Sequence, residues 1–434
     1  MKSFRFLHAA DLHLDSPFKG LFGLPDAVRD RIRESTFSAL SRMVDIAIDE
    51  QVDFVIIAGD VYDLADRSLR AQLRFQQAVG ILSDNGIPVY VVHGNHDPLD
   101  GARARLLWPE SVHFFAADSV ETVIARNKDG EEIAAVSGIS YGKAATMDNL
   151  AERFAQPVPS LFNIAILHTN VDGDADHDNY APCTKDQLIR SGYDYWALGH
   201  IHTRRMLHDS PPIVYPGNIQ GRNVRETGAK GCYIVDVDST GQTTMSFHAT
   251  EAVRWEQLKL SIQGWTEEQQ LKNGLDKLMS DVQANCGDIP AVIRVTLTGR
   301  SVLHTLLQEG SHLQELLAEL RDEQALAAEV NGGRGSFVWI ESCRVETGAE
   351  IPFDKMLEQE SFIGDLLRLS EAMLADDSAL SAFSETALEP LLNHTKASKL
   401  LKDVGPDQLR LLLSAARELA ADELLGESID VRTL

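Results

Sequence analysis

The amino-acid sequence predicts an α/β protein of more than one domain. Apolar runs of strand length alternate with helical patterns over residues 1–240, and several of these runs end directly in clusters of Asp, Asn and His. Such alternation is typical of sheets that are at least partly parallel. Hydrophobic residues make up 44% of the chain and charged residues 24%, which is ordinary for globular proteins with sizeable cores. The length of 434 residues favours two or three domains.

The first region, which we delimit as residues 1–250, supplies most of the expected elements. Its strands are predicted from short apolar runs rich in β-branched and aromatic residues, at residues 4–10, 54–59, 89–93, 133–139, 164–168, 195–199 and 232–237. Helical patterns lie between them, notably at residues 27–50 and 68–83. We therefore expect an α/β core with at least partly parallel sheets.

Two further regions follow. Residues 255–347 contain strand-like runs at 258–262, 291–297 and 337–345, with helical patterns at 266–282 and 301–327, which predicts a small α+β domain. Residues 350–434 are almost wholly helical and hold 17 acids against 8 bases. Amphipathic helices usually bury their own apolar face. A partner-binding arm is the alternative, and the pattern leaves both open.

Net charge and cysteine usage limit the function classes. The formal charge is −25, with 65 acids and 40 bases, which argues against nucleic acid unless a positive local site or a partner supplies the affinity. The four cysteines are scattered and form no CxxC pair, which favours reduced thiols in a cytoplasm. We expect no signal peptide at the N-terminus and no membrane span.

Five polar clusters stand at or just after the ends of apolar strands. In open α/β folds, functional sites gather outside the carboxyl ends of strands. Asn and Asp are also common turn formers, so one such cluster alone would carry no weight. Five in order within about 200 residues favour function. The side chains concerned are Asp11, His13, Asp60, Asp63, Asn95, His96, Asp97, His168, His200 and His202.

The ligand types indicate two divalent metal ions. Residues i and i+2 of an extended chain point to the same side, so Asp11 with His13, and His200 with His202, can each reach one shared site. Carboxylates, imidazoles and an amide without thiolate suit Mn, Fe, Zn, Ni or Co. Asp60 is the natural bridge between two ions. A site with surplus positive charge attracts phosphate, and two ions about 3.5–4 Å apart can generate hydroxide and stabilise attacking and leaving oxygens.

The series DxH, GDxxD, GNHD, H and GHIH resembles the calcineurin-like metallophosphoesterases over residues 4–240. Within that superfamily, residues 215–238 resemble the bacterial SbcD-type DNA-repair exonucleases. The opening FLHAADLHLDSP and the segment HDNYAPC at 177–183 are similar to the YhaO-type subgroup. The resemblance implies a sandwich of two mixed sheets flanked by helices, with the 255–347 region as a capping domain. It also implies that residues 1–250 form the nuclease domain.

Carried over residue by residue, the resemblance implies one metal held by Asp11, His13, Asp60 and His202, and another held by Asp60, Asn95, His168 and His200. His96 would be the catalytic histidine at the scissile phosphate. Asp97 would orient His96 or shape the turn. Asp63 stands where archaeal and eukaryotic nucleases usually carry a histidine, so we expect it to support the site from behind rather than touch phosphate.

The implied activity is a manganese-dependent 3′→5′ exonuclease acting on DNA in repair, as a homodimer with an SbcC-like coiled-coil ATPase docked on helices after the capping domain. Arg222, Arg225 and Lys230 lie among glycines and could contact DNA phosphates, although a solvated hairpin turn explains them equally well. Two alternatives remain open. One is a phosphatase or small-molecule phosphodiesterase, and the other is mainly a scaffold for the ATPase.

Overall fold

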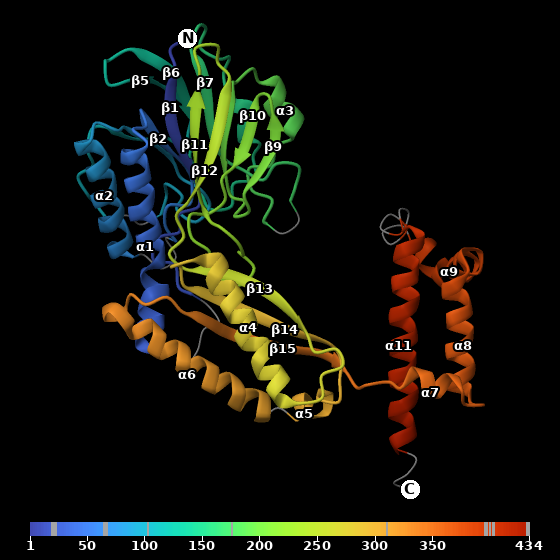
Figure 1. Ribbon diagram of the computed structural model, residues 1–434. Helices are drawn as coiled ribbons and strands as arrows, with labels where there is room; N and C mark the ends of the chain where they lie inside the picture. Colours follow the sequence, from blue (N-terminus) through green and yellow to red (C-terminus); the bar gives the residue numbers. More distant parts are fainter. Residues whose placement is uncertain are drawn as a thin grey trace. The chain divides into compact units, whose positions relative to one another are not determined.

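The computed structural model describes residues 1–18, 24–63, 68–101, 104–174, 177–309, 311–394, 398, 401 and 404–430, without the side chains of 331–333 and 425–430 (Figure 1). The chain divides into two units. One comprises residues 1–258, 277–295 and 317–343, and the other comprises 259–276, 296–316 and 344–434. The predicted segments 177–183 and 232–237 lie within the described ranges.

The first unit contains two mixed sheets of six strands. The first sheet has the order β12-β11-β1-β2-β3-β4, in which β1 to β4 run parallel and β11 and β12 antiparallel to their neighbours. Its strands are β1 (Phe4–Ala9), β2 (Phe54–Ala58), β3 (Val89–Val92), β4 (Val112–Phe114), β11 (Gly231–Val237) and β12 (Thr243–Ala249).

The second sheet has the order β5-β6-β7-β8-β10-β9. Strands β6, β7, β8 and β10 are parallel, whereas β5 and β9 run antiparallel at the two edges. Its strands are β5 (Glu121–Arg126), β6 (Glu132–Gly138), β7 (Phe162–His168), β8 (Tyr195–Gly199), β9 (Arg205–Asp209) and β10 (Pro212–Tyr215).

The two sheets pack face to face around an aromatic-rich core. Phe6 stacks on Phe54 at a centroid distance of 5.2 Å and meets the edge of Tyr195 at the same distance. On the outer face of the first sheet, α1 (Asp26–Asp49) and α2 (Leu69–Asp84) lie side by side (Figure 1). On the outer face of the second, α3 (Lys185–Arg190) and the 3₁₀ helix η2 (Leu150–Arg153) cover Trp196. The predicted sandwich is confirmed.

Every strand and helix predicted for residues 1–250 is present within one or two residues. Five strands were missed: β4, β5, β9, β10 and β12. Four of these lie at sheet edges, where half-exposed side chains dilute the apolar pattern, and β4 has only three residues. Strand β10 is buried but has four residues, too few to separate from a loop by pattern alone.

The middle region forms a three-stranded sheet of order β13-β14-β15, with α4 (Glu268–Cys286) and the pair α5 (His304–Gln308) and α6 (Ser311–Gly333) between strands. The strands are β13 (Arg254–Ser261), β14 (Ala291–Arg300) and β15 (Val338–Gly348). Backbone bonds from Arg254 to Pro290 and from Ile262 to Thr298 advance together along both chains, so these strands are parallel. A parallel pair requires a crossover, which α4 provides.

The C-terminal region is helical as predicted, with α7 (Phe353–Leu357), α8 (Phe362–Ala375), α9 (Asp377–Leu392) and α11 (Pro406–Asp430). The guanidinium of Arg300, at the end of β14, donates to Glu418 and Asp422 of α11. The three-domain division at 250 and 350 stays a prediction. Among the helices of the described ranges, none combines the length and apolar character needed to cross a bilayer.

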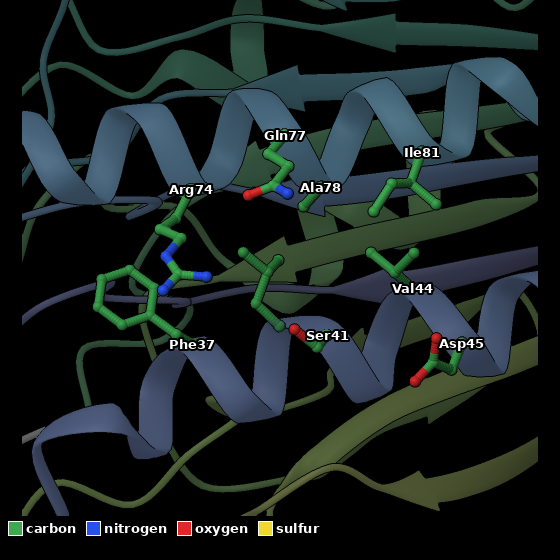
Figure 2. A pocket seen from close by; sticks show the side chains of 9 residues that line it. Phe37, Ser41, Val44, Asp45, Arg74, Gln77, Ala78 and Ile81 are labelled. Carbon is green, nitrogen blue, oxygen red and sulfur yellow. The ribbon is translucent and has the colours of Figure 1, made fainter. Parts of the chain in front are cut away.

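A groove lies between α1 and α2 (Figure 2). Phe37 and Val44 line it from α1, and Ala78 and Ile81 line it from α2, with Arg74 above the ring of Phe37. None of its lining residues belongs to the predicted polar clusters, so the groove is separate from the candidate site described below.

The buried histidine His8 gives a test of the sandwich core. Burial lowers the pKa of its imidazole to about 3 from 6.5, and its Nδ1 lies 3.0 Å from the Tyr195 hydroxyl. The unfolded chain protonates His8 below about pH 6.5, whereas the folded chain does not. The stabilisation that comes from keeping His8 neutral is therefore fully present above that pH and is lost as the pH drops towards 3. For metal-free protein, we expect the free energy of unfolding of His8→Phe to fall by about 2 kcal/mol less than that of wild type between pH ~7.5 and ~5, as measured by urea unfolding. Equal losses would show that His8 is not held neutral.

Candidate metal centre

The predicted polar side chains meet where five strands end. Asp11 and His13 follow β1, Asp60 follows β2, Asn95 follows β3, His168 ends β7, and His200 and His202 follow β8. Three sets of them have ligand atoms within 4.8 Å of one another. They are Asp11–His13–His202, His13–Asp60–His96 and Asp11–Asp60–His168. The structure therefore brings side chains from the first and the last cluster into one site.

Unusual backbone geometry delivers these side chains. Asp11, His13, Asp60 and His200 have φ of 52°, 42°, 50° and 102°, in the left-handed region that non-glycine residues rarely adopt. A Cβ at Gly199 would overlap the carbonyl oxygen of Ala58, so the chain must be glycine there for β8 to approach β2.

Hydrogen bonds decide which ring nitrogens of His13 and His202 face the site. The Nδ1 atom of His13 lies 2.9 Å from the Asp63 carboxylate, and that of His202 lies 2.9 Å from the Glu226 carboxylate. A carboxylate only accepts, so each Nδ1 carries the proton and each Nε2 keeps its lone pair. These two Nε2 atoms lie 3.1 Å apart. Two lone pairs at this distance repel each other when no proton lies between them, so a cation is needed to hold the two nitrogens together.

The same pattern recurs on the other side of the site. His168 Nδ1 donates to the Ala58 carbonyl at 3.0 Å, and His200 Nε2 donates to the Asp178 carbonyl at 2.7 Å. Their remaining nitrogens lie 3.0 and 3.2 Å from Asn95 Oδ1, which is also an acceptor. Asp60 Oδ2 lies 3.3 Å from His168 Nε2 and 3.7 Å from His13 Nε2, so it faces both groups.

The residues present therefore fit metal ions. The site is a His/Asp centre in which hydrogen-bond acceptors converge in two groups that share Asp60, with Asp11, Asp60, His13 and His168 at most 1% exposed. The donor set of nitrogen and oxygen without sulfur suits borderline and hard divalent ions. Asp11, His13, Asp60 and His202 could hold one ion, and Asp60, Asn95, His168 and His200 could hold another.

The pKa shifts follow from this crowding. Burial raises the pKa of Asp11, and the nearby Asp60 carboxylate adds to the rise, although His168 opposes it. For Asp60, burial alone would raise the pKa, but His168 and His13 hold it well below its ordinary value. Burial lowers the pKa of His168, but the Asp60 and Asp11 carboxylates raise it to about 9. A proton occupies His168 when no cation does.

His96 differs from the other site residues because its side chain is 45% exposed. Its Nδ1 lies 2.6 Å from Asp63 Oδ1, which leaves Nε2 free to meet a substrate. Burial of part of the ring lowers the pKa of His96, but Asp63 and Asp60 outweigh this and raise it. His96 is therefore suited to donate a proton.

Asp97 shapes the turn. Its carboxylate accepts from the backbone nitrogens of Gly94 and Val61 at 2.8 and 3.0 Å and lies 2.9 Å from His93 Nδ1. Of the two roles predicted for Asp97, these contacts support the turn role, and it is Asp63 that orients His96.

The three basic residues predicted near DNA lie in different environments. Lys230 is buried and donates to the backbone oxygen of His202 at 2.9 Å. Arg222 is mostly buried and pairs with Asp63 and Glu226. Arg225 is exposed. Of these three, it is Arg225 that presents its charge to solvent.

Glu226 is a site residue that sequence reasoning missed. It lies 24 positions after His202, outside the five polar clusters although within the segment 215–238, and only folding brings the two together. Asn170 was missed as well. Its side chain donates to the carbonyl oxygens of Asp174 and Asp178 and so fixes the loop whose Asp178 carbonyl accepts from His200. The available signal was an Asn two positions after His168, the last residue of its strand.

Comparison with known families agrees with this geometry. The family model described as calcineurin-like phosphoesterase matches residues 4–204, and the one described as the middle domain of metallophosphoesterase YhaO matches residues 255–348. A sandwich of two mixed sheets with a His/Asp metal centre at its strand ends is thus that of a metallophosphoesterase.

Three relatives place the chain more closely. It is 40% identical over 323 residues to the uncharacterized metallophosphoesterase YhaO of Bacillus subtilis, which covers 74% of this chain and 78% of that protein. It is 25% identical over 303 residues to the DNA double-strand break repair protein Mre11 of Aeropyrum pernix, covering 65% and 70%. It is 25% identical over 289 residues to the SbcD component of the nuclease SbcCD of Bacillus subtilis, covering 58% and 72%. The chain belongs to the calcineurin-like metallophosphoesterases, in the YhaO-like group, with the Mre11 and SbcD proteins as distant relatives.

Metal binding should depend on pH because a metal must displace the His168 proton. Below the pKa of about 9, the apparent Mn²⁺ affinity should fall roughly tenfold per pH unit as the protonated fraction rises. Calorimetric titrations between about pH 7 and 9, in buffers of different ionisation enthalpy, would measure both the affinity and the protons released. An affinity that stays constant over this range, with no proton release, would contradict a protonated His168.

Proposed function

We propose that this metallophosphoesterase is a DNA nuclease of the 3′→5′ exonuclease type that acts in DNA repair. The observation that carries the proposal is the contrast within the site. The metal-facing acceptors are buried, whereas His96 is 45% exposed and is oriented by Asp63. A proton donor at the open side of such a site suits a large phosphodiester, which need not enter a pocket. The DNA-repair and nuclease names of the distant relatives support the substrate.

The chain's own residues divide the chemistry. Asp11, His13, Asp60 and His202 hold a first metal position, and Asp60, Asn95, His168 and His200 hold a second. These residues would hold two divalent ions, which we propose to be Mn²⁺, and the ions would supply polarisation of the phosphate and activation of water. His96 Nε2 is placed to donate a proton to the leaving sugar oxygen, because the Asp63 carboxylate holds Nδ1 and, with Asp60, raises the pKa of the ring. The hydrogen bonds of Asp97 hold together the turn that presents His96.

The charge of −25 remains an obstacle to DNA binding. Among the predicted basic residues, we propose a phosphate contact for Arg225, because Arg222 and Lys230 are already engaged by the protein's own groups. The acidic chain also favours a second candidate, a phosphatase or phosphodiesterase for small molecules or nucleotides. Such substrates carry less charge and meet less long-range repulsion.

Nuclease action by His96 can be tested directly. We expect Mn²⁺-loaded wild type to release nucleotides from end-labelled duplex DNA, and His96→Ala to be slower by roughly 10²–10⁴-fold because the leaving oxygen loses its proton donor. The metal content of the variant, measured by atomic emission, should be unchanged because the side chain is not a proposed ligand.

His113→Ala is a matched control, since this histidine pairs with a glutamate on β5 away from the site. Hydrolysis of a generic small phosphodiester is measured beside the DNA. Cleavage of the small ester alone would reject the nuclease and favour the second candidate.

The C-terminal helices are the proposed docking surface for an SbcC-like coiled-coil ATPase, which would also supply DNA affinity. Leu411, Leu412 and Leu419 of α11 are 71%, 50% and 63% exposed, and Leu412 and Leu419 share a face because they are seven positions apart. A scaffold function would use the same surface.

Exposed leucines one turn apart on α2, Leu69 and Leu73, support a homodimer. The four free thiols support a cytoplasmic location.

Replacing the three exposed leucines of α11 with serine should weaken binding of an SbcC-like ATPase at least tenfold, because apolar area would no longer be buried in the complex. Affinity is measured by calorimetry, with circular dichroism to verify helix content. Glu423→Ser, also an exposed position on α11, serves as the control. Unchanged affinity of the leucine variant would remove the proposed docking surface.

A further inference from the structure

The two metal positions differ in what lies behind their imidazole ligands. At the second position, His168 and His200 donate to neutral backbone carbonyls, those of Ala58 and Asp178. At the first position, His13 and His202 donate to carboxylates, those of Asp63 and Glu226, each at 2.9 Å. The protein therefore places charged acceptors behind one position and uncharged acceptors behind the other.

Glu226 is held on three sides. Its Oε2 accepts from the backbone nitrogen of Arg222 at 2.7 Å and from Asn218 Nδ2 at 2.8 Å, and its Oε1 lies 2.9 Å from His202 Nδ1. The His202 contact is shorter than the 3.4 Å from an Arg222 nitrogen to the same Nδ1. Nδ1 therefore donates to the carboxylate, and Nε2 is left to face the metal.

Arg222 ties Glu226 to Asp63. One terminal nitrogen of the guanidinium lies 3.4 Å from Asp63 Oδ2 and 3.0 Å from Ser16 Oγ, and the other lies 3.5 Å from Glu226 Oε1. The side chains of all three charged residues are at most 16% exposed. A planar guanidinium with several donors can hold two carboxylates at once.

The sign of the effect on metal binding follows from the charges. The Arg222 cation by itself would repel a metal ion, but it is shared by two carboxylates, so the group of three retains one negative charge. The hydrogen-bond acceptors behind His168 and His200 carry no charge, and the Asp11 carboxylate oxygen near His168 Nδ1 is 3.8 Å away, beyond hydrogen-bond distance. A carboxylate behind a ligating imidazole fixes its tautomer and raises its basicity, which a neutral carbonyl does to a smaller degree.

We propose that Glu226 is a positioning residue for His202 and that, together with Asp63 and Arg222, it makes the first metal position the tighter of the two. The proposal rests on the two-metal part of the proposed function and not on DNA as the substrate. In the Glu226→Gln variant, the charge is lost, and an amide nitrogen turned towards Nδ1 would favour the wrong tautomer of His202.

The test uses the full chain, stripped of metal and titrated with Mn²⁺ by calorimetry. Wild type should bind two ions with distinct affinities. In Glu226→Gln the tighter event should weaken by about 10–100-fold while the weaker event is unchanged. Electron paramagnetic resonance gives a second readout, because the pair of coupled ions should form in the variant only at correspondingly higher free Mn²⁺.

Two more variants keep the result decisive. Asp63→Asn should weaken the same event through His13, which covers the case in which Glu226→Gln fails to fold. Glu121→Gln removes a carboxylate from another histidine–glutamate pair, His113–Glu121, and should change neither event. Equal weakening of both events, weakening of the looser event alone, or a single event in wild type would each overturn the proposal. Failure of the DNA assay with both events intact would count against the nuclease alone.

Discussion

Repulsion among buried hydrogen-bond acceptors is the constraint on which the rest of the structure depends. Between His13 Nε2, His202 Nε2, Asp60, Asn95 and His168 Nε2, neighbouring acceptors are 3.0–3.7 Å apart. No such arrangement is stable in a protein interior without cations or protons, because burial removes the water that would screen it. The strained backbone at Asp11 and Asp60 adds a further cost of roughly 1–3 kcal/mol at each residue. Metal binding offsets both, so the sandwich is a scaffold for a site that is unfavourable until it is loaded.

The loops that hold no ligand are needed for the same reason. An imidazole can present either ring nitrogen, and the choice is made by the hydrogen bond on its far side. The loop after β7 supplies the Asp178 carbonyl for His200, and the loop after β10 supplies Glu226 for His202. Changes in these loops would therefore alter metal binding although none of their side chains is itself a proposed ligand.

The sequence predicted which residues belong to the site better than how they are held. Strand ends are visible as apolar runs that stop at Asp, Asn or His, and parallel neighbours must end at the same edge. That was enough to bring together His168 and His200 and to expect support from Asp63. The partner of each ring nitrogen was beyond reach, because Glu226 and the Ala58 carbonyl carry no local pattern. Short edge strands such as β9 were missed because solvent-facing residues blur a period of two. The buried state of Lys230 was missed because a glycine-rich context looks the same for a surface turn and a packed one.

Charge also orders the events at the site. Without metal, Asp11 and Asp60 oppose any phosphate, and the Asp63–Arg222–Glu226 group adds one further negative charge. The protonated imidazole of His168 offsets only part of this negative charge. Two divalent ions reverse this balance, so the local potential becomes positive only after loading. The whole chain has a net charge of −25, so a polyanionic substrate is attracted only by this local positive potential. Salt screens that potential over about 8 Å at physiological ionic strength. Phosphate contact must therefore follow metal binding. Long-range attraction of the proposed DNA substrate must come from elsewhere, which is the physical reason to look for a basic partner on the C-terminal helices.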